Sequence, residues 1–349
     1  MTDKDAYEDR IAELEAKIAA LENASQPAYQ ASVFSWKTWA ERYGLILAWI
    51  LIILVLGAFK PAQMFAWNSY ASMLGSNAMV VVLTLALIVP LTTGDFDLSV
   101  AATMGLSSMI IAVLNVQQEI PIFGAVVVAL LAGAAIGAAN AFFILYFRVF
   151  SLIVTLGTGY FVAGLILWIS DSGTIAGVSM DLVRAVILTR VFGIPIGFYY
   201  ATALTLIIWY VFQHTSLGRR MLFVGRGREV ARLSGVNVMR IRAGALIASS
   251  IIAAFAGVLY TGMRGVADPS SALAFLLPAF AAAFLGSTAI YPGRFNAIGA
   301  FVAVYFLSTG IMGLNFLGVD SFVQNLFYGG GLVIAVAISQ LIRGRKEMG

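Results

Sequence analysis

The chain is poor in the residues that most often carry enzyme and metal chemistry. It has no cysteine and a single histidine, His214. Disulfides, thiolate metal sites and cysteine nucleophiles are therefore excluded, and one histidine leaves little room for a histidine-based metal centre. Charged residues are also scarce, at 11% of 349 residues, against roughly 25% in soluble domains. So few charges could not cover a water-soluble fold, so we expect lipid around most of the chain.

Several sequence motifs are missing as well. The chain has no phosphate-binding P-loop, no H-E-x-x-H segment and no G-x-S-x-G segment, so we do not expect it to hydrolyse ATP or to act as an enzyme, and we predict no cofactor or metal. The apolar runs lack the ladder of acids and histidines that is common in proton-coupled carriers. Any energy for transport must then come from another protein.

Long uncharged runs divide the chain into helix-sized pieces. A helix needs about 20 apolar residues to cross the hydrocarbon core. The runs predict an all-α, polytopic membrane protein of about ten transmembrane helices. Runs rich in small residues, such as 132–139, favour closely packed helices. The ten runs cover residues 43–59, 61–94, 98–118, 120–147, 149–170, 191–218, 243–263, 269–293, 295–319 and 321–342.

The basic residues set the expected orientation. Segment 214–242 holds seven arginines and one acid, Glu229, and the C-terminal residues 343–349 add three more basic residues. Because basic loops stay in the cytoplasm, both segments should be cytoplasmic. Ten spans then place the N-terminus in the cytoplasm too, with segment 171–190 outside. The predicted location is the bacterial inner membrane.

The N-terminal residues have a different pattern. Tyr7, Ile11, Leu14, Ile18 and Leu21 follow the 4-3-4-3 spacing of a heptad seam. Residues 1–24 are therefore interpreted as a cytoplasmic coiled-coil helix or, equally well, as a lone solvated helix, which is marginal at this length. Residues 25–42 are predicted to be a linker, residues 43–342 the membrane domain and residues 343–349 a cytoplasmic tail.

Two aspartates, Asp95 and Asp97, interrupt an otherwise apolar stretch. An aspartate in the middle of a membrane helix costs roughly 2.5–3.5 kcal/mol on insertion scales, so both should lie at a helix break or at a water-filled depth. One interpretation is an element of a permeation path. The other is that Asp97 caps the next helix through its free N–H groups, which would leave Asp95 unexplained.

Two further polar segments follow. Residues 228–234 are good helix formers, and Gly235 can end that helix in a left-handed cap. This short helix in segment 214–242 is either a docking element or a loop that only sets topology. Residues 285–294 resemble the stretch around Asp95 in position, because each follows a run containing a proline (Pro90 or Pro278). The two predict a weak internal repeat, an arrangement typical of transporters.

Four segments, in this order, carry a resemblance to a known family. Residues 93–100 look like the T-G-G-I-D-L-S-V-G segment of ribose/xylose/arabinose-type sugar ABC permeases. Residues 229–238 are similar to that family's A-A-R-L-S-G-I-x-V segment. Residues 285–294 resemble its L-G-G-T-S-L-x-G-G-x-G block, and residues 315–319 match its N-x-L-G-V turn. The resemblance runs from about residue 43 to residue 342.

The resemblance implies a function and partners. Such permeases work in pairs, as homodimers or heterodimers, with a cytoplasmic ATP-binding subunit and a periplasmic sugar-binding protein; nucleic acid is not among the expected partners. The expected function is the membrane-spanning part of an ATP-driven importer of a monosaccharide or related polyol. The resemblance implies contact with the ATPase for Glu229, Ala231, Arg232, Leu233, Ser234 and Gly235, and a path-lining or gating role for Asp97 and Ser99. Four neighbouring residues are further candidates for the translocation path: Asp95, Phe96, Gly286 and Ser287.

The chain departs from the family pattern at several positions. Asp95 replaces the family's second glycine, Phe96 its isoleucine, and Ser287 a second glycine of the third block. These changes add bulk and one charge. Alternatives are therefore an ABC permease for another small polar solute, such as a nucleoside or a signalling furanone, and an ion-coupled secondary carrier or channel. A membrane enzyme or scaffold is a further class, supported only by the heptad seam.

Overall fold

The computed structural model describes residues 10, 16–17, 36–320 and 322–347. The chain divides into two units, Met1–Ala40 and Glu41–Gly349. The heptad positions predicted to form a coiled coil lie outside the described residues. Helix α2 (Trp36–Phe59) begins inside the segment predicted as a linker, and α16 (Phe322–Glu347) continues into the segment predicted as a tail.

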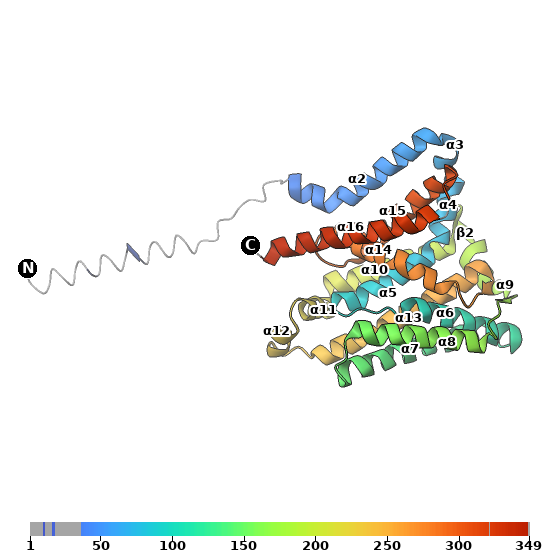
Figure 1. The fold of residues 1–349 in the computed structure, drawn as a ribbon, viewed down its shortest axis with the longest axis horizontal. Helices are drawn as coiled ribbons and strands as arrows, with labels where there is room; N and C mark the ends of the chain where they lie inside the picture. The colour runs from blue at the N-terminus through green and yellow to red at the C-terminus, as the bar shows by residue number, and fades with distance from the viewer. Residues whose placement is uncertain (1–9, 11–15, 18–35, 321, 348–349) are drawn as a thin grey trace, which may run out of the picture. The chain divides into compact units, whose positions relative to one another are not determined.

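The second unit is a bundle of helices joined by short connections (Figure 1). Its α-helices after α2 are α3 (Pro61–Met64), α4 (Trp67–Ser76), α5 (Ala78–Thr92), α6 (Val100–Ala112), α7 (Ile122–Tyr146), α8 (Ser151–Ile169), α9 (Met180–Val183), α10 (Ile196–His214), α11 (Ser216–Arg226), α12 (Arg228–Leu233), α13 (Val238–Arg264), α14 (Leu276–Gly286), α15 (Ala297–Phe316) and α16. Two π-helical turns, η1 (Val113–Gln117) and η2 (Arg184–Leu188), extend α6 and α9, and a 3₁₀ turn, η3 (Ala272–Phe275), precedes α14.

The structure agrees with the prediction of an all-α membrane protein, but it does not show ten full-length spans. Within the described residues, seven helices are long and apolar enough to cross a membrane, and α4 with α5 forms a further candidate span that is bent by 43°. The run 269–293 instead holds the short helix α14, whose 11 residues rise only about 16 Å, roughly half of the hydrocarbon thickness. In the run 321–342, the apolar part of α16 is Phe322–Ala337, counted over the residues whose side chains the structure describes.

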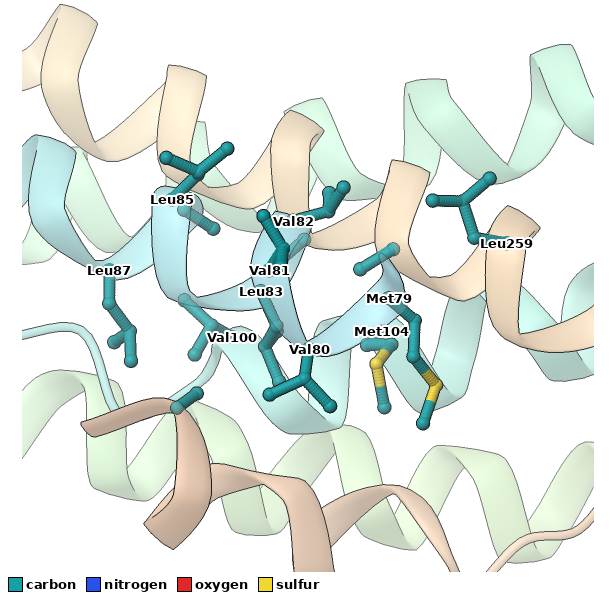
Figure 2. Packing of buried hydrophobic residues seen from close by; sticks show 14 of the residues in the cluster. Met79, Val80, Val81, Val82, Leu83, Leu85, Leu87, Val100, Met104 and Leu259 are labelled. Atoms are coloured by element: carbon teal, nitrogen blue, oxygen red, sulfur yellow. The ribbon is translucent and has the colours of Figure 1, made fainter. Parts of the chain in front are cut away.

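Helix α5 forms the centre of the bundle. All of its residues are buried, and it packs against α13 on one side and against α10, α14 and α15 on others. Figure 2 shows its side chains meeting Val100 and Met104 of α6 and Leu259 of α13. A helix that is apolar all round must be covered on all sides, so the neighbouring helices, rather than α5, present the apolar side chains that face outward.

Small residues allow the close packing that the sequence predicted. A β-carbon placed on Gly133 of α7 would lie 2.6 Å from the β-carbon of Ala254, and one on Gly137 would lie 2.7 Å from the α-carbon of Ile247, both in α13. Only glycine fits such contacts, so the small residues of 132–139 bring α7 against α13. This part of the packing prediction is confirmed.

Segment 171–190, predicted as a loop, is partly ordered by strands. β1 (Ile175–Ala176) pairs with β4 (Val266–Ala267), which follows α13, and β2 (Arg190–Val191) pairs with β3 (Ile194–Pro195) in a hairpin. Both residues at the hairpin tip, Phe192 and Gly193, have positive φ, as a two-residue turn of this kind requires. The strands lie at the end of the bundle away from α12 (Figure 1).

Candidate functional site: two helix breaks, a short exposed helix and a polar cavity

The break between α5 and α6 is built by its own sequence. Gly94 adopts φ 78°, its N–H donates to Leu91 O, and the N–H of Asp95 donates to Pro90 O. These two hydrogen bonds form a Schellman motif, which ends a helix at a glycine. Residues 95–97 have no regular structure and residues 98–99 turn into α6. The hydroxyls of Ser151 and Thr155 on α8 accept from the N–H groups of Phe96 and Leu98. Hydrogen bonds from α5 and α8 therefore stabilise the break.

Asp95 lies in this break and joins three elements. Its side chain is 1% exposed. Arg242 of α13 donates twice to it, from Nε to Oδ2 at 2.7 Å and from Nη2 to Oδ1 at 2.6 Å. Arg228, the first residue of α12, donates to Oδ1 at 3.0 Å and to the carbonyl of Gly94 at 2.9 Å. A buried carboxylate needs such partners, which accounts for a charge in an apolar stretch.

Asp97 forms a separate network with neutral partners. Its Oδ1 accepts from the backbone N–H of Ser99 at 3.0 Å and from the Ser99 hydroxyl at 2.6 Å, and its Oδ2 accepts from the Ser249 hydroxyl of α13 at 3.0 Å. Asn140 of α7 donates to the Ser99 hydroxyl at 2.9 Å. Ser99 is the N-cap of α6, and no side chain that the structure describes accepts from the free N–H groups of that helix, so the interpretation of Asp97 as a cap is wrong. Asp97 instead holds Ser99, just before α6, and ties this turn to α13.

The network around Asp97 is incompletely satisfied. All four side chains are buried, yet within the described residues Oδ1 of Asn140 and the hydroxyl of the neighbouring Ser250 have no hydrogen-bond partner. Unpaired buried polar atoms are rare and favour a rearrangement or a bound water.

The second break, between α14 and α15, is held by a neutral amide. Asn296 caps α15 by accepting from the N–H of Gly299 at 2.6 Å, and it donates to the carbonyls of Gly286 and Ala289. A β-carbon on Gly286 would lie 2.5 Å from the backbone nitrogen of Ala300, so α14 and α15 touch there. Ser287 is buried and donates to Phe284 O. Each break thus has a polar side chain at the start of the following helix.

Helix α12 is exposed apart from one residue. It covers Arg228–Leu233, and Gly235 ends it with φ 79° and a second Schellman motif, so the predicted helix and cap are confirmed. Ala231 is buried, whereas Leu233 is 83% exposed and Val230 is also exposed. Glu229 and Arg232 form an exposed ion pair at 2.7 Å. Ser234 and Gly235 are exposed as well. An apolar tip inside a basic, solvated segment is typical of a docking surface.

A cavity of about 640 Å³, here called the polar cavity although apolar side chains such as Met73 and Ile311 also line it, lies between α4, the β2–β3 hairpin, α15 and α16. Helix α4 and strand β2 lie at the end of the bundle away from α12 (Figure 1). Most of its polar groups are amides and hydroxyls, from α4, the turn after α4, α15 and α16. Among the described residues that line it, none is acidic and only Arg190 is charged. Its polar lining residues are Asn68, Ser69, Ser72, Ser76, Asn77, Arg190, Ser308, Asn315 and Tyr328.

The residues predicted from sequence fall into three places. Asp95, Phe96, Asp97 and Ser99 lie together in the first break, Gly286 and Ser287 lie in the second, and the six predicted contact residues lie on or just after α12. In the described part of the chain, none of them lines the cavity. Sequence reasoning did not single out the cavity or the partners of Asp95. The signal for the latter was present, since a buried acid requires a cation and segment 214–242 offers seven arginines.

Comparison with known proteins identifies the family. Residues 69–336 match the family described as branched-chain amino acid transport system / permease component. The chain belongs to this permease family. It is also 28% identical over 309 residues to the D-allose transport system permease protein of Escherichia coli K12, with 88% of this chain and 94% of the relative covered.

Two further relatives have different substrates in their names. The autoinducer 2 import system permease protein of Photorhabdus laumondii is 32% identical over 306 residues, covering 85% of this chain and 91% of the relative. The ribose import permease protein of Escherichia coli K12 is 27% identical over 305 residues, covering 86% and 94%. No solved structure matches the chain significantly. The predicted resemblance to sugar ABC permeases is confirmed: this chain is the multi-pass membrane permease of an ABC importer, and ATP is hydrolysed on a partner subunit.

Proposed function

We propose that this permease imports a monosaccharide or related polyol and that the polar cavity is the outer part of its path. The cavity is the observation that carries the proposal. Hydroxyls and amides both donate and accept hydrogen bonds, as sugar hydroxyls do, and Phe316 and Tyr328 add aromatic surface. The absence of acids among its described lining residues argues against a cationic solute.

The relatives suggest two substrate classes for the same cavity. Two of them carry allose and ribose in their names, and the more identical one carries autoinducer 2. An autoinducer 2 importer is therefore the second candidate and belongs to the class of other small polar solutes. A nucleoside remains a further member of that class, without a relative to favour it.

Uptake measurements separate these candidates. The permease is reconstituted with its ATPase and binding protein, and ATP-dependent uptake of labelled D-ribose is measured in competition with D-allose, autoinducer 2 and a nucleoside. We expect one of the aldoses to compete most strongly. Strongest competition by autoinducer 2 would establish the second candidate, and no competition by an aldose would contradict the first.

A bulky substitution tests the cavity itself. Ser72 is exposed in the cavity, so Ser72→Trp should fill it and lower uptake at least tenfold, while assembly with the ATPase stays unchanged. Ser216→Trp, an exposed position at the start of α11, is the matched control and should import normally. Normal import by Ser72→Trp would remove the cavity from the path.

We also propose that two permease subunits face each other across this cavity, as a homodimer or a heterodimer. Asn68, Ser72 and Ser76 are exposed polar residues on α4, a helix between apolar runs. Polar side chains at membrane depth face a water-filled path or another protein rather than lipid. A second subunit would enclose them, and a periplasmic binding protein would deliver the substrate to the same end.

The proposed topology has ten membrane segments, including the half-length α14, with both chain ends, segment 214–242 and any N-terminal coiled coil in the cytoplasm. The cysteine-free sequence makes this directly testable with single cysteines. Phe192→Cys should react with a membrane-impermeant maleimide on intact cells, and Arg226→Cys only after permeabilisation. The reverse pattern would invert the topology.

The residues of α12 are proposed to contact the ATPase. Leu233 is the exposed apolar tip and Ala231 the buried anchor, and Glu229, Arg232, Ser234 and Gly235 surround them. Leu233→Asp should abolish co-purification with the ATPase while the permease still inserts into the membrane. Unchanged co-purification would contradict the assignment.

The two breaks are proposed to act as gates of the path. In the first break, Asp97 accepts from the Ser99 hydroxyl, and the N–H of Phe96 donates to Ser151 of α8. Gly286 and Ser287 lie in the second break, where the Ser287 hydroxyl donates to Phe284 O. Asp97→Ala should abolish uptake because it removes the link of α6 to α13. If Asp97 were only a cap, its loss would cost about 1 kcal/mol and uptake would be nearly normal.

A further inference from the structure

Asp95, Arg228 and Arg242, here called the Asp95 cluster, connect the exposed helix α12 to the centre of the bundle. Asp95 follows α5, Arg228 begins α12 and Arg242 lies in the first turns of α13. Both oxygens of the carboxylate are used, and Oδ1 accepts from both arginines. One buried carboxylate thus links three segments that are far apart in sequence.

The two arginines hold Asp95 in different ways. Arg242 is 15% exposed and binds through two nitrogens, a geometry that fixes orientation as well as distance. Arg228 is 42% exposed and binds Oδ1 through one nitrogen. The Arg242 contact is therefore the permanent one, and water can compete for the Arg228 contact.

Helix α12 has few other ties to the break. Its remaining residues are exposed except Ala231, and the elements that α12 packs against are α11 and α13. Within the described residues of α12, Arg228 is the one whose side chain hydrogen-bonds to residues 93–95. The end of α11 also touches the break, since a β-carbon on Gly225 would lie 2.1 Å from Thr92 O. Arg228 is therefore the side-chain connection through which a displacement of α12 would reach the α5–α6 break.

We infer that the Asp95 cluster transmits the movement of α12 to the α5–α6 break, with Arg228 and Asp95 as positioning residues for transport. The inference rests on the proposed contact between α12 and an ATPase. When that contact moves α12, Arg228 pulls the carboxylate and the Gly94 carbonyl, and Arg242 passes the displacement to α13. The family pattern has glycine at position 95, so this connection is a property of this chain.

The inference is tested by the amount of solute imported per ATP hydrolysed in the reconstituted complex of permease, ATPase and binding protein. Arg228→Gln should bind the ATPase normally and retain at least half of the ATP hydrolysis, yet import at least tenfold less solute per ATP. Arg228→Lys keeps the charge and should retain most of the wild-type ratio. Arg240→Gln, an exposed arginine of the same segment, is the matched control and should be normal.

A double-mutant cycle decides whether Arg228 acts through Asp95. If it does, Asp95→Asn combined with Arg228→Gln should be no worse than the more severe single variant, because the ion pair of Arg228 with Asp95 is already lost in either one. Should Arg228→Gln fail to insert, Asp95→Gly, which introduces the family residue, replaces it and should show the same loss of import per ATP.

The possible failures are distinguishable. A wild-type complex that shows no ATP-dependent uptake contradicts the proposed function. A working wild type with a normal ratio in Arg228→Gln overturns only the inference. Loss of ATPase binding in Arg228→Gln would make Arg228 a docking residue and would also overturn it, as would fully additive losses in the double variant.

Discussion

The two helix breaks solve the same structural problem with different chemistry. Asp97 accepts a hydrogen bond from Ser99, just before α6, and Asn296 accepts one from Gly299, in the first turn of α15. The α14–α15 break is otherwise closed by backbone contacts, with Gly286 against Ala300. The α5–α6 break adds a buried carboxylate, Asp95, with partners on α12 and α13.

The buried carboxylate of Asp95 has no counterpart in the second break, so support of the break alone does not explain it. A neutral amide is enough to support a break, so a charge in the first break must have another use. Asp95 accepts no hydrogen bond from the start of α6 and instead reaches the exposed α12. The first break is therefore connected to the surface that is proposed to receive the ATPase, and the second break is not connected in this way within the described residues.

The sharpest test of this comparison removes the permanent partner of Asp95. Arg242→Ala leaves a 1% exposed carboxylate with only the half-exposed Arg228, and breaking a buried ion pair destabilises a fold by about 3–5 kcal/mol. We expect a large loss of thermal stability, measured by fluorescence-detected size-exclusion chromatography. Adding Asp95→Gly removes the buried charge and should restore much of it. Wild-type stability in Arg242→Ala would contradict the buried pairing.

The second break should depend on close packing instead. Gly286→Ala puts a β-carbon 2.5 Å from a backbone nitrogen, and such overpacking costs typically about 1–3 kcal/mol. Gly244→Ala in α13, where a β-carbon would meet nothing within 4 Å, is the control and should be neutral or slightly stabilising. Equal melting temperatures for the two variants would disprove the close contact.

Loss of the neutral cap should have a smaller effect. Asn296→Ala removes the acceptor for Gly299 N–H, at about 1 kcal/mol for a lost cap, together with the hydrogen bonds donated to Gly286 and Ala289. Asn296→Ser keeps a capping oxygen and should lie between Asn296→Ala and the wild type in thermal stability. A serine variant no better than the alanine variant would show that the cap is not what Asn296 contributes.

The smallest effect is expected for an exposed ion pair. Glu229 and Arg232 pair at 2.7 Å but are both largely exposed, and such pairs contribute at most about 1 kcal/mol. Glu229→Gln should leave the melting temperature unchanged, in contrast to Arg242→Ala. A large thermal shift would mean that α12 is held by its own charges rather than by Arg228 and Ala231.

Much of the architecture could be predicted from apolar runs and small residues. The runs located a helix at each expected place, and the glycine and alanine content of α7 indicated its close packing with α13. The half-length α14 could not be predicted, because the run 269–293 is apolar throughout and hydropathy does not reveal where a helix starts. The strands were missed because two-residue pairs leave no alternating pattern.

The site could be predicted only in part. Gly235 and the helix formers before it were sufficient to locate α12, since cap chemistry is local. The partners of Asp95 lie more than a hundred residues away, and any of several arginines could have supplied them. The cavity combines serines and asparagines from helices that are distant in sequence, each of which also occurs as an ordinary membrane-helix residue, so no local pattern distinguishes them.

The central claim is that ATP hydrolysis on a partner drives solute import through this chain. It is tested most directly by uptake of labelled sugar into right-side-out vesicles loaded with ATP, with and without an uncoupler, in the presence of the ATPase and the binding protein. We expect uptake that requires ATP and continues in the presence of the uncoupler. Uptake that ignores ATP and collapses with the ion gradient would contradict it.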